Sequence, residues 1–310
     1  MRIVFMGTSQ FAVPALEKLI ESSYEVVGVV TQPDRPKGRG KKVTPTPVKE
    51  FVQSINIPVY QPQNIKEPNA VDFITSWDPD LIIVVSYGQI IPPKILQLPP
   101  AGCINIHASL LPSYRGAAPI QRCLMNGDAK TGITTMFMDE GLDTGDILLQ
   151  EEVAINDETT YGELHDLLAH TGANLIIATI NKLKQGSLTR TKQNDKDSTY
   201  AEMIRKADEL INWQDDAWKI YNQIRGLNPQ PGAYTLLDNH TLKIFKARIV
   251  EEYQQGQPGE ITSVLPEGFI VKAGSLALKI LELQQEGKKR INTNDFLKGH
   301  SLKTGTLLGK

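Results

Sequence analysis

The apolar positions of the first hundred residues predict short strands that alternate with amphipathic helices. Residues 2–6 and 24–30 are rich in β-branched residues, and between them apolar residues recur at helical spacing over 11–20. Residues 80–85 contain an unbroken apolar run, which is typical of a central parallel strand covered on both faces. This alternation of strands and helices predicts a mostly parallel α/β sheet.

Helical patterns dominate the middle of the chain. Thr160–Glu163 fits a capping box, and the apolar periodicity that continues to Leu183 predicts a long helix after it. Further helices are expected over 201–210 and 217–227.

Short strands are expected towards the carboxyl terminus. After Gly232, apolar stretches at 241–245, 268–271 and 276–281 are separated by Gly and Pro turns. Regularly spaced short strands of this kind predict a small barrel or sandwich.

The length of 310 residues exceeds the usual size of one domain, and 40% apolar residues are enough for a substantial core. Residues 186–203 are polar and are interpreted as an exposed linker. We therefore predict a first domain over 1–203 that ends in this linker, and a second domain over 204–310.

The formal net charge of −2 is unevenly distributed, with 18 basic and 23 acidic side chains in 1–204 but 15 basic and 12 acidic in 205–310. Cys103 and Cys123 are too few for a disulfide framework and are not spaced as a metal-binding pair, so buried thiols in a reducing cytoplasm are expected. Because the chain enters a strand pattern at once and has no run of about 18 apolar residues, neither a signal peptide nor a transmembrane helix is expected.

Residues 103–110 combine strand alternation with polar groups that a core strand would lack. A strand here puts Asn105 and His107 on one face and aliphatic side chains on the other. An imidazole accepts a proton near neutral pH, a carboxamide donates hydrogen bonds to an oxyanion, and a carboxylate such as Asp143 orients an imidazole. The alternative is structural: His107 is a core histidine with its hydrogen bonds satisfied, and Asp143 forms a turn.

Residues 32–47 form a loop with two glycines, four prolines and five cations against one acid, Asp34. Most charge runs are simply solvated surface. A flexible loop that presents several cations also suits a phosphate backbone that is contacted without base readout. The five cations are Arg35, Lys37, Arg39, Lys41 and Lys42.

Around Asn105 and His107 the sequence resembles the folate-dependent formyltransferases. The motif runs from Asn105-x-His107 through Ser109-Leu110-Leu111-Pro112-x-Tyr114-Arg115-Gly116, with Asp143 downstream. The similarity covers nearly the whole chain, and 31–42 and 228–234 resemble in particular the members that act on charged initiator tRNA. The resemblance implies a Rossmann-like formyltransferase domain followed by a small OB-like β-barrel domain. It also implies a monomer that moves a formyl group from 10-formyltetrahydrofolate to the α-amine of methionine on initiator tRNA, without a metal.

The resemblance further implies roles for single residues. His107 would act as general base, Asp143 would orient it, and Asn105 would stabilise the oxyanion. Folate contacts would come from Ser109, Leu110, Leu111, Pro112, Tyr87, Gly88, Gln89 and Ile90. The tRNA would meet Arg35, Arg39, Lys41 and Lys42, and the basic surface would extend to Lys288 and Arg290. Tyr114 and Arg115 either brace the loop or contact a substrate.

Two other functions fit parts of the pattern. A folate formyltransferase that acts on an amino sugar or a nucleotide precursor would use the same three catalytic residues, but it has no use for the basic loop. A protein that only binds RNA would leave Asn105, His107 and Asp143 unexplained.

Overall fold

The computed structural model describes all residues except 38, 39, 41, 253, 254 and 310. The chain forms two compact units. The first consists of Met1–Gly116, Lys130–Ala154 and His165–Tyr200, and the second consists of Ala117–Ala129, Ile155–Leu164 and Ala201–Lys310.

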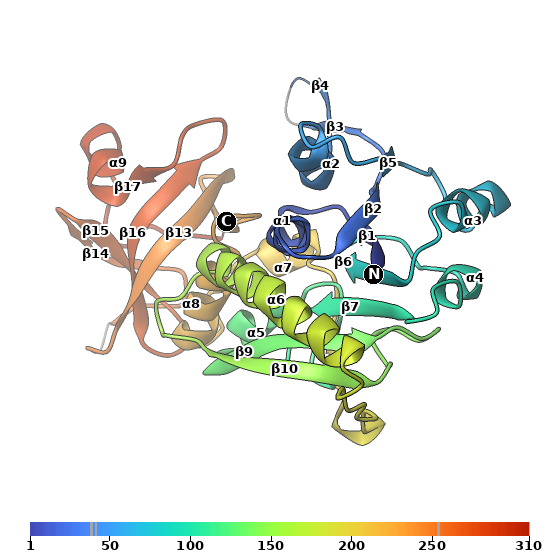
Figure 1. Cartoon of the computed structure of the whole chain (residues 1–310). Coiled ribbons are helices and arrows are strands. Elements are labelled where there is room, and N and C mark those ends of the chain that lie inside the picture. Colours follow the sequence, from blue (N-terminus) through green and yellow to red (C-terminus); the bar gives the residue numbers. More distant parts are fainter. Residues whose placement is uncertain (38–39, 41, 253–254, 310) are drawn as a thin grey trace. The chain divides into compact units, whose positions relative to one another are not determined.

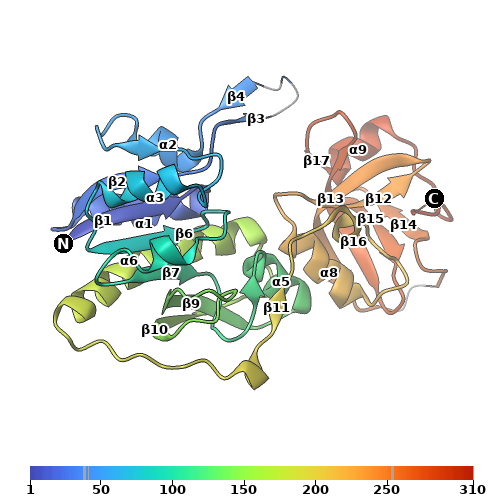
Figure 2. The same ribbon diagram turned by 90° about the vertical axis from the view of Figure 1, so that its right-hand side faces the viewer.

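A seven-stranded sheet forms the centre of the first unit (Figures 1 and 2). Its order is β10-β9-β7-β6-β1-β2-β5, in which the strands from β7 to β5 run parallel and β9 and β10 form an antiparallel edge. The strands are β1 (Arg2–Gly7), β2 (Glu25–Val30), β5 (Val59–Tyr60), β6 (Leu81–Val85), β7 (Cys103–His107), β9 (Lys130–Phe137) and β10 (Ile147–Ala154). The predicted, mostly parallel α/β sheet is therefore confirmed.

Helices cover both faces of this sheet. They are η1 (Gln10–Ala12), α1 (Val13–Glu21), α2 (Pro47–Val52), α3 (Pro68–Thr75), α4 (Pro93–Leu96) and α6 (Tyr161–Lys184). On one face Ile74 of α3 belongs to the same apolar core as Met6 of β1. On the other face α6 lies so close to the sheet that a Cβ on Gly172 would be 2.9 Å from Ile106. Because both faces are covered, β6 is apolar throughout.

The long helix α6 begins at the predicted capping box. The backbone N–H of Thr160 donates to Oε2 of Glu163 (2.9 Å), and the N–H of Glu163 donates to Oγ1 of Thr160 (3.4 Å). Despite the length of α6, the described residues contain no helix that is both long and apolar enough for a membrane span.

The second unit is built on a six-stranded sheet of order β12-β13-β16-β15-β14, with β17 paired to β16. All of its ladders are antiparallel. The strands are β12 (Ala233–Leu237), β13 (His240–Val250), β14 (Ile261–Leu265), β15 (Gly268–Lys272), β16 (Ala277–Gln285) and β17 (Ile291–Asn292). The helices are α5 (Pro119–Asn126), α7 (Lys206–Glu209), α8 (Ala217–Gly226) and α9 (Thr293–Gly299). The predicted strands at 241–245, 268–271 and 276–281 are therefore confirmed.

The predicted helix over 201–210 is wrong, because only the four residues of α7 are helical there. The guanidinium of Arg122 instead binds the backbone carbonyls of Glu202 (3.1 Å) and Met203 (3.3 Å). These carbonyls accept hydrogen bonds from Arg122 and not from backbone N–H groups of a helix. Tertiary contacts therefore override the local helical propensity.

The short elements are β3 (Arg35–Lys37), β4 (Lys42–Thr44), β8 (Arg115–Gly116), β11 (Tyr200–Ala201) and η2 (Asp195–Asp197). Of these, β3 and β4 form a two-stranded antiparallel hairpin, and β8 and β11 form a second two-stranded ladder.

Candidate active site

His107 ends β7, on the face opposite Ile106. Its side chain is only 6% exposed, and its Nε2 lies 2.9 Å from the carbonyl oxygen of Tyr114. Because a carbonyl can only accept, Nε2 is the donor in this hydrogen bond. In the neutral ring Nδ1 is therefore the nitrogen that can take up a proton.

Asp143 approaches that nitrogen from the turn between β9 and β10. Its Oδ2 lies 3.6 Å from Nδ1 of His107 and accepts a 2.8 Å hydrogen bond from the backbone N–H of Gly116. The backbone of Asp143 has a φ of +55°, in the left-handed region that aspartate tolerates better than most residues. The fold thus brings together two residues that the sequence analysis singled out from separate stretches.

Asn105 is half-buried and lies two residues before His107, on the same face of β7. Within the part of the chain that the structure describes, its carboxamide makes no hydrogen bond. The amide is therefore available to a ligand, as a donor to an oxyanion must be.

The loop after β7 is fixed by the buried hydroxyl of Thr134 on β9. Thr134 Oγ1 donates to the carbonyl of Ser109 (2.6 Å) and accepts from the backbone N–H of Leu111 (3.1 Å). It also accepts from Nε2 of Gln150 (2.9 Å), which donates to the carbonyl of Leu111 as well (2.9 Å). Both strands of the antiparallel edge therefore hold this loop.

The same loop contains four of the residues predicted to contact folate. Ser109 is fully buried and its hydroxyl donates to the carbonyl of Ser113 (2.6 Å), and Leu111 is also buried. Leu110 and Pro112 are half-buried and expose part of their side chains. The apolar surface that this loop offers a ligand thus comes from Leu110 and Pro112.

The other predicted folate loop follows β6, the parallel neighbour of β7. Tyr87 is buried, burial together with the nearby Tyr60 raises the pKa of its phenol, and its hydroxyl has no partner among the described residues. Gln89 accepts from the backbone N–H of Ile65 (2.8 Å), whereas Gly88 is exposed and Ile90 is 74% exposed. An exposed isoleucine at the carboxyl edge of a parallel sheet is a natural contact for an apolar ring.

Arg115 shows a contact that the sequence analysis did not find. Although it is an arginine, it is only 1% exposed, and its Nη2 donates to Oε1 of Gln193 (2.9 Å) and to Oδ1 of Asp195 (2.8 Å). Arg115 therefore braces the loop. The polar segment that was interpreted as a linker thus makes hydrogen bonds to the site, and no local pattern in the sequence marks Gln193 for this role.

Two of the predicted tRNA-binding cations lie on the β3–β4 hairpin. Thr44 lies directly opposite Arg35, and Lys42 lies two residues before Thr44, so the exposed Arg35 and Lys42 share one face of the hairpin. The predictions for Arg39 and Lys41 fall outside the described residues.

The base of this hairpin is held by the carboxylate of Asp34. Its Oδ2 lies 2.6 Å from Nζ of Lys49, and its Oδ1 accepts from Nε2 of Gln61 (2.6 Å). The hydrogen bonds from Lys49 and Gln61 hold the pKa of Asp34 below its usual value. The side-chain contacts of Asp34 thus hold the start of the hairpin that carries Arg35 and Lys42.

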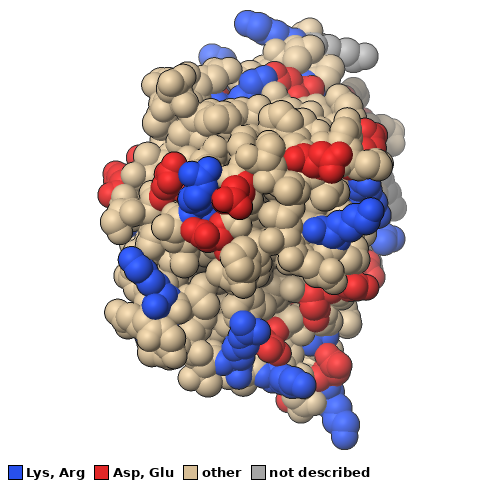
Figure 3. All heavy atoms as spheres, turned by 45° about the vertical axis from the view of Figure 1, so that its right-hand side comes forward, with Lys and Arg blue, Asp and Glu red and all other residues tan. Residues whose placement is uncertain are grey.

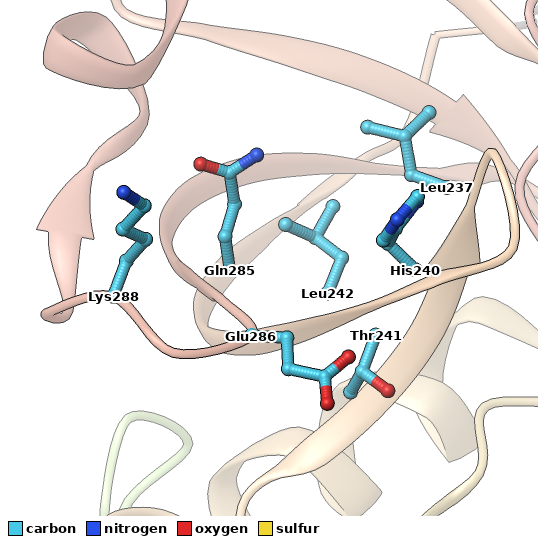
Figure 4. A pocket seen from close by; sticks show the side chains of 7 residues that line it. All are labelled: Leu237, His240, Thr241, Leu242, Gln285, Glu286 and Lys288. Carbon is cyan, nitrogen blue, oxygen red and sulfur yellow. The ribbon is translucent and has the colours of Figure 1, made fainter.

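The two cations predicted in the second unit differ from each other. The Arg290 guanidinium binds both carboxylate oxygens of Glu282 at 2.6 Å and lies 4.4 Å from the centre of the Phe245 ring, so its charge is largely committed. Lys288 is exposed at the edge of a cavity of about 120 Å³ (Figure 4). The cavity is lined by Leu237, His240, Thr241, Leu242, Gln285, Glu286 and Lys288.

On the face in Figure 3, Lys and Arg are interspersed with Asp and Glu, so no single sign of charge dominates it.

Comparisons with known proteins decide the family. The model of the formyl transferase family matches residues 1–180, and that of the formyl transferase C-terminal domain matches 203–301. The chain belongs to the formyl transferase family. Methionyl-tRNA formyltransferase of Syntrophomonas wolfei is 53% identical over 310 residues, covering 100% of this chain and 99% of that protein. The protein of the same name from Geobacter sulfurreducens is 51% identical over 310 residues, covering 100% and 97%.

Solved structures share the formyl transferase fold. HypX from Aquifex aeolicus in complex with tetrahydrofolic acid matches with a TM-score of 0.67 and 17% identity over 99% of this chain, which spans 50% of that longer chain. WlaRD, a sugar 3N-formyl transferase, matches with a TM-score of 0.68 and 20% identity, over 93% of this chain and 99% of that one. The predicted fold class, a Rossmann-like formyltransferase domain followed by a smaller β domain, is confirmed. In the described part of the chain, no group of three or more His, Cys, Asp and Glu side chains could hold a metal ion.

Proposed function

We propose that this chain transfers the formyl group of 10-formyltetrahydrofolate to the α-amino group of methionine on initiator tRNA. The observation that carries the reaction is the approach of Asp143 to Nδ1 of His107, beside an amide of Asn105 that no described residue occupies. The acceptor rests on relatives named methionyl-tRNA formyltransferase that match the chain from end to end. The exposed cations Arg35 and Lys42 support a phosphate-bearing substrate.

His107 acts as the general base in this reaction. The methionyl amine attacks the formyl carbon and loses its proton to Nδ1, because Nε2 is engaged with the carbonyl of Tyr114. The proton then lies beside Oδ2 of Asp143, so a carboxylate faces the imidazolium that forms.

Asn105 stabilises the negative charge that develops on the formyl oxygen. The side chain of Asn105 is on the same face of β7 as that of His107. The amide can therefore donate to the formyl oxygen while the imidazole accepts the proton. When the bond from the formyl carbon to the donor nitrogen breaks, His107 returns the proton to that nitrogen. The products are formylated methionyl-tRNA and tetrahydrofolate.

The formyl donor would be held at the carboxyl edge of the sheet. Ile90, Leu110 and Pro112 offer apolar contacts from neighbouring loops, and the buried Tyr87 hydroxyl offers a polar one. The proposal includes a monomer that works in the cytoplasm. Buried thiols at Cys103 and Cys123 are suited to a reducing compartment.

Formyl transfer to methionine on initiator and elongator tRNAs tests the proposal, with wild type, Arg39→Ala and Lys94→Ala measured together. Lys94 is an exposed lysine of α4 and serves as the matched control. We expect transfer to the initiator tRNA alone, weakened by Arg39→Ala and unchanged by Lys94→Ala. Transfer to an amino sugar but to neither tRNA would refute the acceptor, and no transfer to any amine would refute the reaction.

A further inference from the structure

We propose that Gln193 is a positioning residue that holds Asp143 in place for the reaction, an inference that rests on the proposed function. Gln193 is half-buried and lies in the polar segment between α6 and β11. Its carboxamide makes hydrogen bonds both to the backbone of Asp143 and to the side chain of Arg115.

The donor side of the amide holds the turn that carries Asp143. Nε2 of Gln193 donates to the carbonyl of Asp143 (2.8 Å) and to the carbonyl of Gly145 (2.8 Å). These two hydrogen bonds hold the backbone of Asp143, Thr144 and Gly145 from one side. Asp143 has a φ of +55°, a conformation that is uncommon for a non-glycine residue and persists where its surroundings impose it. The two hydrogen bonds from Gln193 help to hold Asp143 in this conformation.

The acceptor side of the amide is fixed by a buried cation. Oε1 of Gln193 accepts from Nε (3.1 Å) and Nη2 (2.9 Å) of Arg115. Burial opposes the charge of Arg115, but the hydrogen bonds that its guanidinium donates to Asp195 and Tyr200 outweigh burial and leave the pKa of the guanidinium raised. Arg115 therefore stays charged and fixes which end of the amide is oxygen and which is nitrogen. All four hydrogen-bonding capacities of the amide are used.

The two halves of this network meet at the catalytic carboxylate. Gly116, the neighbour of Arg115, donates its backbone N–H to Oδ2 of Asp143, while Gln193 holds the carbonyl of the same aspartate. Asp143 is thus fixed at both its side chain and its backbone. Loss of Gln193 would free the backbone end and let the carboxylate drift from Nδ1 of His107.

The second unit supplies a matched control. Nε2 of Gln223 donates to the carbonyls of Asp208 (2.8 Å) and Leu210 (3.0 Å), again two residues apart, and Gln223 is half-buried like Gln193. Gln223→Ala removes the same pair of hydrogen bonds from the end of α7, which carries no catalytic residue. It separates a general loss of stability from a loss of positioning.

Kinetics of the full-length protein test the inference with Gln193→Ala, Gln193→Glu and Gln223→Ala. We expect Gln193→Ala to lower kcat by about tenfold to a hundredfold while KM for the formyl donor changes by less than about threefold. Gln193→Glu keeps the acceptor for Arg115 but turns a carboxylate towards two carbonyls, so its loss should be at least as large. Gln223→Ala should leave kcat unchanged. A wild-type kcat in either Gln193 variant would overturn the inference.

A double-mutant cycle shows whether Gln193 acts through Asp143. In an Asp143→Asn background, Gln193→Ala should lower kcat by less than about twofold, because the group that it positions is already disabled. Independent losses that multiply in the double variant would overturn the inference.

Hydrogen exchange distinguishes a failure of the positioning role of Gln193 from a failure of the proposed function. Backbone amides of 139–146 should exchange faster in Gln193→Ala and at the wild-type rate in Gln223→Ala. Unchanged exchange in Gln193→Ala would refute the positioning role whatever the acceptor is. A wild type that formylates no tRNA, together with faster exchange in Gln193→Ala, would refute only the proposed function.

Discussion

Oδ2 of Asp143 lies 3.6 Å from Nδ1 of His107 and accepts a hydrogen bond from the backbone of Gly116. The N–H of Gly116 is always present, whereas Nδ1 donates only when the ring is protonated. In the neutral ring a lone pair faces the carboxylate, and in the imidazolium an N–H faces it. The Asp143 carboxylate is therefore placed to accept a hydrogen bond from Nδ1 when that nitrogen carries a proton.

The charge of Asp143 can be removed with little change of shape by Asp143→Asn. We expect kcat to fall by about a hundredfold or more, within the range of general acid–base catalysis. Single-turnover formyl transfer measures the loss. Asp146→Asn, in the same turn, is the control and should stay near wild type. Equal losses in both variants would show that the turn matters and that the Asp143 carboxylate has no special role.

Asn105→Ala tests the oxyanion donor. We expect kcat to fall by about a hundredfold to a thousandfold. The melting temperature should hardly change, because no hydrogen bond among the described residues is lost. Calorimetry alongside the kinetics separates the two effects, and near-normal turnover would remove Asn105 from the mechanism.

The hairpin cations should contribute to tRNA binding through phosphate contacts. Replacing Arg35 and Lys42 together with alanine should weaken binding, and the slope of log K against log salt should become shallower by about 0.9 for each lost contact to a duplex phosphate. Arg290→Ala is the contrasting variant. Because its guanidinium is committed to Glu282, this change should lower the melting temperature and leave the salt slope unchanged. An unchanged slope in the Arg35 and Lys42 variant would exclude the hairpin from the interface.

The anchor at the base of the hairpin should depend on pH. Hydrogen bonds from Lys49 and Gln61 depress the pKa of Asp34 below its ordinary 3.8. A depressed carboxyl pKa stabilises the fold above the unfolded-state value, and this contribution disappears as the pH falls through the folded-state value. Asp34→Asn should therefore cost about 1–2 kcal/mol at neutral pH and progressively less below 3.8. Chemical unfolding across this pH range measures the difference, and a constant difference would contradict the assignment.

The thiol of Cys103 should be unreactive in the folded protein. Burial raises its pKa to about 12, so the thiolate fraction at pH 8 is about one in ten thousand. In Cys123→Ala, a thiol reagent should label Cys103 rapidly only after unfolding in urea, whereas the slow labelling of the native protein should accelerate as the pH rises towards 12. Rapid labelling of the native variant at pH 8 would contradict the burial.

Local patterns were sufficient where the burial of an element follows from its own sequence. The apolar run of β6, the capping box of α6 and the alternation of β7 each show their environment within a few residues. The same alternation singled out Asn105 and His107. Their assignment as catalytic residues, like that of Asp143, depended on the resemblance to a family.

Contacts between distant segments could not be read from the sequence in this way. The segment 201–210 has a helical pattern, but Arg122 takes two of its carbonyls. Gln193 lies in a polar stretch typical of a linker, and its partners are Arg115 and the turn at 143–145. Such pairings depend on the path of the folded chain, and propensity carries no information about them.

The saturated hydroxyl of Thr134 has a consequence for substrate binding. With its one hydrogen and both lone pairs engaged by Ser109, Leu111 and Gln150, it has no capacity left to respond to a ligand. The loop after β7 thus loses its conformational entropy when the chain folds and has little left to lose on binding. A substrate that reaches His107 meets a rigid surface, so its affinity is not reduced by the ordering of this loop.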